Sequence, residues 1–184
     1  MILTKSEIIR QYDLGTIVID PYKEQHVGPN SYDLTLSPYL LKYQNDRLDM
    51  KCEEPTYELH INEREGLLLI PNTVYIAMTN EKCGSDIFVT CIEGRSSVAR
   101  LGIQIHLTAG FGDLGFKSNW TLEMKVAQPV VVYPNVRICQ ASFHVPHGTI
   151  GDNLYKGKYQ DQPRPTASKL YKDFLPRSLE IKNT

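Results

Sequence analysis

The feature that most constrains this chain is its succession of short strand-like runs, each closed by a turn signal. Apolar and polar residues alternate with a period of two, the spacing of side chains on the faces of a β-strand. Turn-forming residues such as Pro71-Asn72 and Pro134-Asn135 separate the runs. The predicted strands are 17–19, 32–36, 39–42, 57–61, 67–70, 74–78, 87–92, 103–107, 119–126, 130–133 and 137–144. Many short strands with close turns favour an all-β sandwich or barrel over a βαβ fold.

A few short helices are expected to interrupt the strands. Thr4 and Glu7 have capping-box spacing ahead of an apolar stripe, which predicts a helix at the start of the chain. A second short helix is expected over 96–101. Because 184 residues, 41% of them hydrophobic, suffice for one domain with a substantial core, we expect a single domain over 1–184.

The charge and hydropathy of the chain bear on whether it binds nucleic acid or a membrane. Lys and Arg number 20 and Asp and Glu number 21, so the formal net charge is −1. A near-neutral chain has no global attraction for nucleic acid or an anionic membrane, and we expect neither partner. The longest aliphatic run, 67–70, is far shorter than the roughly 20 residues of a membrane span. Charges at Lys5, Glu7 and Arg10 interrupt any signal peptide, so a cytoplasmic location is expected.

The sequence lacks the familiar motifs of metal sites and of phosphate-binding loops. None of the four cysteines forms a Cys-x-x-Cys pair, and Cys91 and Cys139, in strand-like runs, are expected as buried thiols. The zinc deaminase signature, the P-loop, the dinucleotide fingerprint and the His-Glu-x-x-His helix are all missing from the sequence. We therefore expect chemistry without a protein-bound transition metal.

The segment 155–174, called the tail below, differs from the rest of the chain. Lys, Gln, Pro and Ser dominate it and aliphatic residues are few. Such a segment contributes little core and is expected to be mobile unless something orders it. The last stretch, 175–184, carries no motif, and its role is left unassigned.

A first candidate site lies around the second predicted helix. If that helix begins at Ser96, its free backbone N–H groups, with the neighbouring Ser97, offer an anion site. Arg95 flanks this end, and Arg100 lies four residues after Ser96 on the same helical face. Two guanidinium groups suit a phosphate chain. An ordinary helix cap with solvated arginines explains the same spacing.

A second candidate site lies on the strand 119–126. Its alternation puts apolar residues on one face and Thr121, Glu123 and Lys125 on the other. A carboxylate on such a rigid element can act as a general base if partial desolvation raises its pKa. The alternative interpretation is an exposed strand residue paired with Lys125.

The loop between these two sites is rich in glycine. Three glycines between 110 and 115 allow close backbone approach to a ligand, and Asp113 suits a sugar hydroxyl, although Gly and Asp also make ordinary turns. His106 alternates with apolar neighbours and is interpreted as a hydrogen-bonded structural histidine.

Taken together, the motifs resemble the dCTP deaminase family of the trimeric dUTPase-like superfamily. The resemblance spans nearly the whole chain, and the order and spacing of its segments carry it. The segments are Pro-Asn-Ser-Tyr-Asp-Leu-Thr-Leu at 29–36, Glu-Gly-Arg-Ser-Ser-x-x-Arg at 93–100, Thr-Ala-Gly-Phe-x-Asp-x-Gly-Phe at 108–116, Thr-Leu-Glu at 121–123, Arg-Ile-Cys-Gln at 137–140 and Gly-Lys-Tyr-Gln-x-Gln at 157–162.

This resemblance implies a distorted β-barrel or jelly-roll subunit in a homotrimer, with three sites at the subunit interfaces. It implies metal-free hydrolytic deamination of the cytosine ring of dCTP. Glu123 would be the general acid and base, Ser96 and the carbonyl of Ala109 would orient the water, and Arg100 would support charge at the reacting centre. Mg²⁺ is expected on the substrate triphosphate, without a protein ligand and without zinc.

The resemblance also implies the substrate contacts. The tail would close as a lid over bound nucleotide. The expected contacts are Arg95, Ser96, Ser97, Arg100 and Gln140 toward the phosphates and reacting centre, Asp113 toward the 3′-hydroxyl, Thr121, Leu122 and Glu123 in the pocket, and Tyr155, Lys158 and Gln162 from the tail.

Gly110 and Phe111 bear on the product. Family members that stop at dUTP tend to have His-Arg there, and Gly-Phe is similar to the bifunctional subgroup that forms dUMP, a supply for thymidylate synthesis. A glycine and an aromatic residue would leave room for a second water near the α-phosphate. Leu114, where related sequences commonly have Pro, alters loop stiffness more than chemistry. The alternatives are a deaminase that releases dUTP, a dUTPase, and a nucleotide-binding regulator without turnover.

Overall fold

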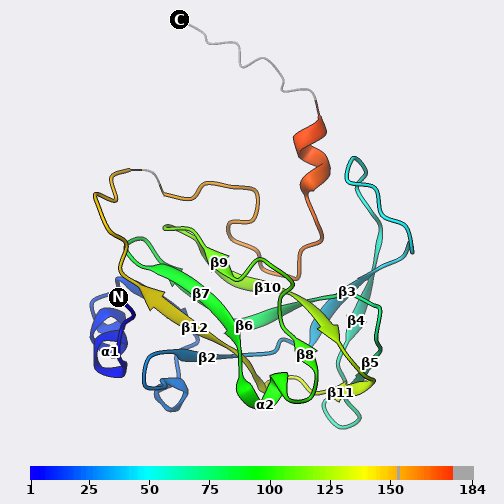
Figure 1. Cartoon of the computed structure of the whole chain (residues 1–184), viewed down its shortest axis with the longest axis horizontal. Coiled ribbons are helices and arrows are strands. Elements are labelled where there is room, and N and C mark those ends of the chain that lie inside the picture. Colours follow the sequence, from blue (N-terminus) through cyan, green and yellow to red (C-terminus); the bar gives the residue numbers. More distant parts are fainter. Residues whose placement is uncertain (153, 176–184) are drawn as a thin grey trace, which may run out of the picture.

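The described part of the chain, residues 1–152 and 154–175 of a computed structural model, consists mainly of β-strands (Figure 1). The helices are α1 (Lys5–Asp13) and α2 (Ser96–Ala99), with 3-10 turns η1 (Glu24–His26) and η2 (Leu170–Phe174). The strands are β1 (Ile17–Asp20), β2 (Tyr32–Thr35), β3 (Tyr39–Tyr43), β4 (Thr56–His60), β5 (Leu67–Leu69), β6 (Tyr75–Ser85), β7 (Val89–Gly94), β8 (Ile103–Gln104), β9 (Phe111–Gly112), β10 (Lys117–Val126), β11 (Val130–Val132) and β12 (Arg137–His144). The expectation of an all-β fold with a few short helices is confirmed.

The strands form three antiparallel sheets. The largest has the order β4-β3-β6-β10-β8, with β1 also paired to β6. The second has the order β2-β12-β7-β9, and β11 pairs with β5 alone. One core cluster takes side chains from both larger sheets, such as Leu34 and Phe143 from the second and Leu122 and Met124 from the first. Both sheets therefore bury one face against the same core.

Each predicted strand has a counterpart, but two differ in length by three or more residues and one strand was missed. β6 continues through the polar residues 79–85, because β1 and β10 both pair with it there. β8 ends at Gln104, since it reaches only the last residues of β10 before the chain leaves the sheet. The missed strand, β9, lies in the glycine-rich loop, where Phe111 and Gly112 pair with β7.

The first helix is confirmed, but the capping box is wrong. Thr4 is the N-cap residue, yet its side chain makes no cap hydrogen bond. The Glu7 carboxylate instead accepts from Arg10 Nη2 at 2.6 Å and Gln11 Nε2 at 2.7 Å. These hydrogen bonds, that from Arg10 first, lower the pKa of Glu7 to about 2. Because the carboxylate is held by side chains further along the helix, it does not reach back to the cap.

The cysteines are all free thiols. Cys139 is fully buried, as expected, and burial raises its pKa well above the usual value for a thiol. Cys91 is only partly buried, although burial raises its pKa as well.

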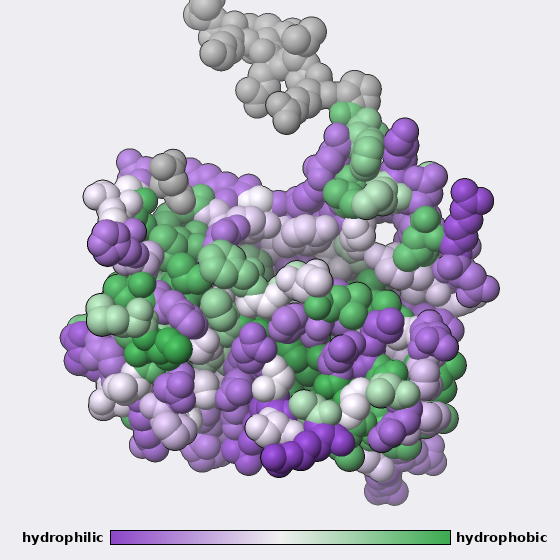
Figure 2. Space-filling model, viewed as in Figure 1, coloured by the Kyte–Doolittle hydropathy of each residue, from purple (hydrophilic) through white to green (hydrophobic). Residues whose placement is uncertain are grey.

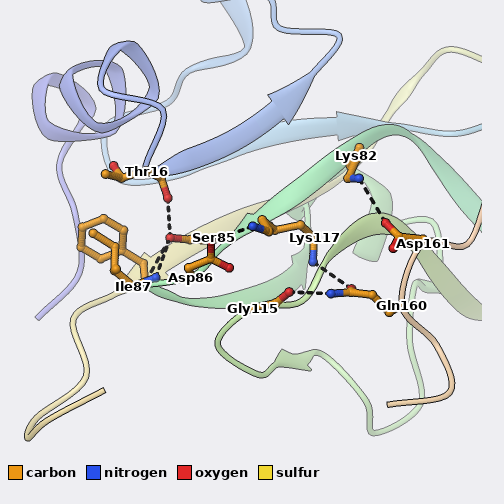
Figure 3. Close-up of polar contacts among 10 residues, drawn as sticks. Thr16, Lys82, Ser85, Asp86, Ile87, Gly115, Lys117, Gln160 and Asp161 are labelled. Carbon is orange, nitrogen blue, oxygen red and sulfur yellow. Dashed lines mark hydrogen bonds and ion pairs between the residues drawn. The ribbon is translucent and has the colours of Figure 1, made fainter. Parts of the chain in front are cut away.

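Contacts within the chain hold the middle of the tail against β6 and β10 (Figure 3). Gln160 Nε2 donates to the carbonyl of Gly115 at 2.7 Å, and Gln160 Oε1 accepts from the Lys117 amide at 3.2 Å. Lys82 Nζ lies 3.2 Å from Asp161 Oδ1. These contacts attach the middle of the tail to the six-stranded sheet. Of the unassigned stretch 175–184, only Leu175 falls within the described residues.

Among the residues that the structure describes, no helix is both long and apolar enough to cross a membrane. Exposed apolar side chains lie scattered among polar ones on the face seen in Figure 2.

Candidate functional site

A cavity of about 460 Å³ lies between β10, the glycine-rich loop and the tail. Apolar side chains make up much of its wall, with a few polar groups among them. Its lining residues are Tyr43, Val74, Ile76, Ala109, Phe111, Gly112, Asp113, Phe116, Trp120, Thr121, Glu123, Tyr155, Tyr159, Gln162, Thr166 and Ser168. An apolar pocket with a few convergent polar groups is the usual form of a small-molecule site.

Glu123 is the carboxylate of this cavity. The burial of β10 alternates as predicted, so Glu123 lies on the face opposite the core residues Leu122 and Met124. Burial raises the pKa of the Glu123 carboxyl, while hydrogen bonds from its own amide and from Leu107, and the nearby His106, oppose that shift. Within the described chain it makes no ion pair with Lys125. A carboxyl whose pKa is raised by partial burial is suited to general acid–base chemistry.

The glycine-rich loop supplies the mouth of the cavity, and its glycines are needed for packing. A Cβ atom on Gly112 would lie 2.4 Å from the Trp120 indole. A Cβ atom on Gly110 would lie 2.6 Å from the carbonyl oxygen of Ile92 and 2.7 Å from His106 Nε2. The space beside Gly110 is therefore filled by protein, whereas Phe111 lines the cavity and is 66% exposed. The second water expected in this region stays a prediction.

His106, interpreted from the sequence as a hydrogen-bonded structural histidine, lies next to the carboxylates of this region. Its Nε2 atom is 4.0 Å from Glu93 Oε2, and its positive form would stabilise the ionised form of Glu123. Its buried Nδ1 atom has no hydrogen-bond partner in the part of the chain that the structure describes. The expected hydrogen bond is thus not seen, and the ring packs against Gly110 instead.

An aromatic wall of the cavity was not predicted. The ring of Phe116 meets Trp120 edge to face, with centroids 4.9 Å apart, and meets Tyr155 in the same way at 5.7 Å. The indole Nε1 of Trp120 donates to the carbonyl of Cys83 at 3.0 Å, which fixes the ring. The only signal in the sequence was the presence of aromatic residues just after the glycines, since alternation alone assigned Trp120 to the core.

Two of the three predicted tail residues line the cavity and one does not. Tyr155 and Gln162 line it, and Gln162 Oε1 accepts from the Thr121 hydroxyl at 3.2 Å. Lys158 lies outside the lining, where its Nζ atom is 2.7 Å from a carboxylate oxygen of Asp173.

The predicted phosphate contacts form a separate group. Arg95 Nε donates to Asp33 Oδ1 at 3.0 Å, and Arg137 Nη1 donates to Asp33 Oδ2 at 3.2 Å. Gln140 Nε2 donates to the carbonyl of Gly94, next to Arg95, at 3.2 Å. Asp33, Arg95, Arg137 and Gln140 are called the arginine cluster below. None of the four lines the cavity.

Ala109, Asp113 and Thr121 line the cavity as predicted, but four further predicted residues lie outside its lining. Ser96 and Ser97 are exposed on α2, which is shorter than expected, and Arg100 follows it. Leu122 is buried in the core, so its side chain cannot contact a ligand in the cavity. In Figure 1, α2 and the tail lie on opposite sides of the body of the protein. One chain therefore carries the predicted site in two groups.

The described residues offer no obvious metal site. Within 1–152 and 154–175, no three His, Cys, Asp or Glu side chains gather closely enough to hold a metal ion.

Comparison with known proteins gives one consistent result. A family profile described as dCTP deaminase-like matches residues 2–145. Proteins named "dCTP deaminase, dUMP-forming" from Clostridium beijerinckii and Leptospira biflexa are each 48% identical to this chain, over 95% of its length and 99% and 98% of theirs. The protein of that name from Cytophaga hutchinsonii is 46% identical, over 95% of this chain and 99% of its own.

The fold has a counterpart among solved structures. The crystal structure of 2′-deoxycytidine 5′-triphosphate deaminase from Agrobacterium tumefaciens matches with a TM-score of 0.62 at 20% identity. The match covers 79% of this chain and 48% of that one, so the chain spans about half the length of that protein. At this identity the likeness concerns the fold alone.

Proposed function

Because this chain belongs to the dCTP deaminase-like family, we propose that it hydrolyses dCTP to dUMP, ammonia and diphosphate. The observation that carries the proposal is the half-buried Glu123, whose pKa is raised by burial and which lines a largely apolar cavity. Two waters are consumed, one at the ring carbon that loses the amine and one at the α-phosphate. The names of the relatives support dUMP as the product. That product would supply thymidylate synthesis.

The deamination step uses Glu123 as the base and then the acid. Its carboxylate takes a proton from the attacking water and delivers protons to the ring nitrogen and to the leaving ammonia. The hydroxyl of Ser96 and the carbonyl of Ala109 orient this water, and Arg100 supports charge at the reacting centre. Positioning and proton transfer supply the rate enhancement.

The nucleotide is bound by both groups of residues. The Asp113 carboxylate accepts a hydrogen bond from the 3′-hydroxyl of the sugar. Thr121 and Gln162 close the pocket, and Leu122 contributes only its backbone. Arg95, Ser96, Ser97 and Gln140 hold the phosphates, whose Mg²⁺ enters with the substrate. Tyr155 and Lys158 close from the tail, and Lys158 exchanges the Asp173 carboxylate for phosphate as it does so.

A homotrimer would join the two groups into three complete sites. The proposed reaction needs Ser96 and Glu123 at the same water, yet Ser96 lies outside the cavity of its own chain. A neighbouring subunit that brings α2 to the mouth of the cavity supplies it. Leu101, just after α2, and Leu107, whose backbone amide hydrogen-bonds to Glu123, are 52% and 46% exposed and would be covered by such an association.

The proposed setting is the cytoplasm, where nucleoside triphosphates and reduced thiols coexist. Four free cysteines suit that compartment.

A product assay tests the function. The protein is incubated with dCTP and Mg²⁺, and dUTP, dUMP, diphosphate and ammonia are resolved. We expect dUMP without accumulated dUTP. Accumulated dUTP alone would identify a deaminase that stops there, hydrolysis of added dUTP with inert dCTP would identify a dUTPase, and binding without product would identify a regulator.

The rate should depend on pH through Glu123. The ionised carboxylate is the base, and burial raises its pKa, so kcat/KM for dCTP should fall as the pH decreases through a midpoint above the usual value for Glu, about 4.3. The dissociation constant of dCTP is also measured for Glu123→Gln over the same pH range. This control separates a fall in kcat/KM caused by protonation of Glu123 from one caused by weaker binding of dCTP. A midpoint at or below the usual value would contradict the proposed environment of Glu123.

Gly110 should be intolerant of any side chain. A Cβ there would overlap the Ile92 carbonyl and His106, so Gly110→Ala should lower the free energy of unfolding by about 1–3 kcal/mol. Gly94→Ala is the matched control, because its Cβ would meet nothing nearer than Ile105 Cγ1 at 3.7 Å. Denaturant unfolding of both variants at one protein concentration makes the measurement, and equal stabilities would show that the loop rearranges freely.

A further inference from the structure

The arginine cluster contains a second arginine with no assigned role. Arg137 lies at the start of β12, and Asp33 lies on β2, the neighbouring strand. The two oxygens of the Asp33 carboxylate are divided between the two guanidinium groups, Oδ1 to Arg95 and Oδ2 to Arg137. Arg95 Nη1 also donates to the backbone carbonyl of Arg137 at 3.2 Å. One carboxylate thus fixes two arginines side by side.

The charge of this cluster is not balanced. Asp33, whose side chain is only 15% exposed, carries one negative charge against two positive ones. Gln140 and the neighbouring Ser31 are polar but uncharged, and Ser31 Oγ donates to Gln140 Oε1 at 3.1 Å. Because the two guanidinium groups share a single carboxylate, the cluster keeps a net positive charge, which attracts a further anion.

The donors left over are suited to an anion. Among the described residues, Arg95 Nη2 and the Nε and Nη2 atoms of Arg137 make no hydrogen bond. The Arg137 side chain is 46% exposed, so these donors can be reached from solvent. Guanidinium groups bind phosphate oxygens through paired N–H donors, and a fixed fork loses less entropy on binding than a free one.

We propose that Arg137 is a further phosphate-binding residue and that Asp33 is the positioning residue that aligns it with Arg95. The inference rests on the proposed function, in which Arg95 and Gln140 bind the substrate triphosphate. Asp33 acts through the two arginines and does not touch the substrate. The competing interpretation is a pair of ion pairs that only join β2, the start of α2 and β12.

The experiment measures binding and turnover in the full chain. The dissociation constants of dCTP and of inorganic tripolyphosphate are measured by calorimetry for the parent protein, Arg137→Gln and Arg10→Gln. Arg10 is the matched control, because it forms an exposed ion pair with Glu7 on α1, away from the cluster. We expect Arg137→Gln to weaken both ligands by about 10- to 100-fold, the usual loss for hydrogen bonds to a charged group, and Arg10→Gln to leave both unchanged.

The kinetic constants distinguish positioning from stability. Asp33→Asn should raise KM for dCTP by about 10-fold with kcat nearly unchanged, because a neutral amide cannot hold both arginines. Arg137→Lys, which keeps the charge but not the paired donors, should give a smaller loss than Arg137→Gln.

Each outcome is decisive. If Arg137→Gln lowers the melting temperature but binds tripolyphosphate as the parent does, the cluster is only a structural ion pair. If Arg137→Gln fails to fold, parent-like tripolyphosphate binding by Arg137→Lys overturns the proposal, and weaker binding supports it. If the parent protein binds neither dCTP nor tripolyphosphate, the proposed function itself fails. If the parent protein binds both ligands and the variants bind them equally well, only the role of Arg137 and Asp33 is overturned.

Discussion

Glu123→Gln is expected to lower the rate of ammonia release from dCTP by about 10²- to 10⁴-fold, the usual contribution of a general acid–base group. The amide keeps the size and hydrogen-bonding shape of the carboxylate but cannot take a proton from water. Because Glu123 lies on a strand with both neighbours in the core, the substitution should leave the fold unchanged. Ammonia is measured with a coupled assay, and dCTP affinity by calorimetry.

Glu58→Gln provides the comparison for this variant. Glu58 is an exposed carboxylate on β4 and takes no part in the cavity, so its replacement should leave the rate as it was. We also expect Glu123→Gln to bind dCTP with nearly the affinity of the parent protein. Ammonia release at the parent rate would remove Glu123 from its proposed role.

The second large effect is expected from mixing two inactive variants. Glu123→Gln and Ser96→Ala each remove one half of the proposed site, and each alone should be nearly inactive. If a site combines the cavity of one subunit with α2 of its neighbour, random co-assembly of the two variants restores about a quarter of the sites, because a cyclic homotrimer has one kind of interface. The activity of the co-expressed mixture is compared with that of each variant.

The control for this experiment is a mixture in which both changes lie on the same chain. When double-variant chains are co-expressed with parent chains, a site between subunits is again intact in the same fraction of cases as in the first mixture. A site within one chain would instead be intact in every parent chain, so the activity would equal the fraction of parent chains. A mixture of the two single variants that stays as inactive as each alone would show that Ser96 and Glu123 do not meet across an interface. Mass measurement in solution would confirm that the variants assemble as the parent does.

The local patterns of the sequence were sufficient for most of the fold. The alternation in β10 correctly predicted which face carries Glu123, because one face of the strand is buried along its whole length. The polar half of β6 was not predicted as a strand, because pairing with β1 and β10 decides it and its own residues do not. β9 is only two residues long, too short for a period to be seen.

The candidate site was harder to predict where it depends on distant contacts. Ala109, Asp113, Glu123 and Gln162 were named from motifs, and all four line the cavity. The bond between Asp33 and Arg95 joins residues 62 positions apart, and nothing local to either residue indicates it. The aromatic wall was missed for a similar reason, since the same residue types also build cores.

The contacts of the tail change what truncating this protein would mean. Gln162 is 5% exposed and is tied to Ser118 and Thr121 on the strand that carries Glu123. A chain shortened before residue 155 would lose an entire wall of the cavity, and it would expose Ile76 and Trp120 to water. The shortened protein would therefore lack part of its binding cavity. Its inactivity would not show whether the tail opens and closes over the nucleotide.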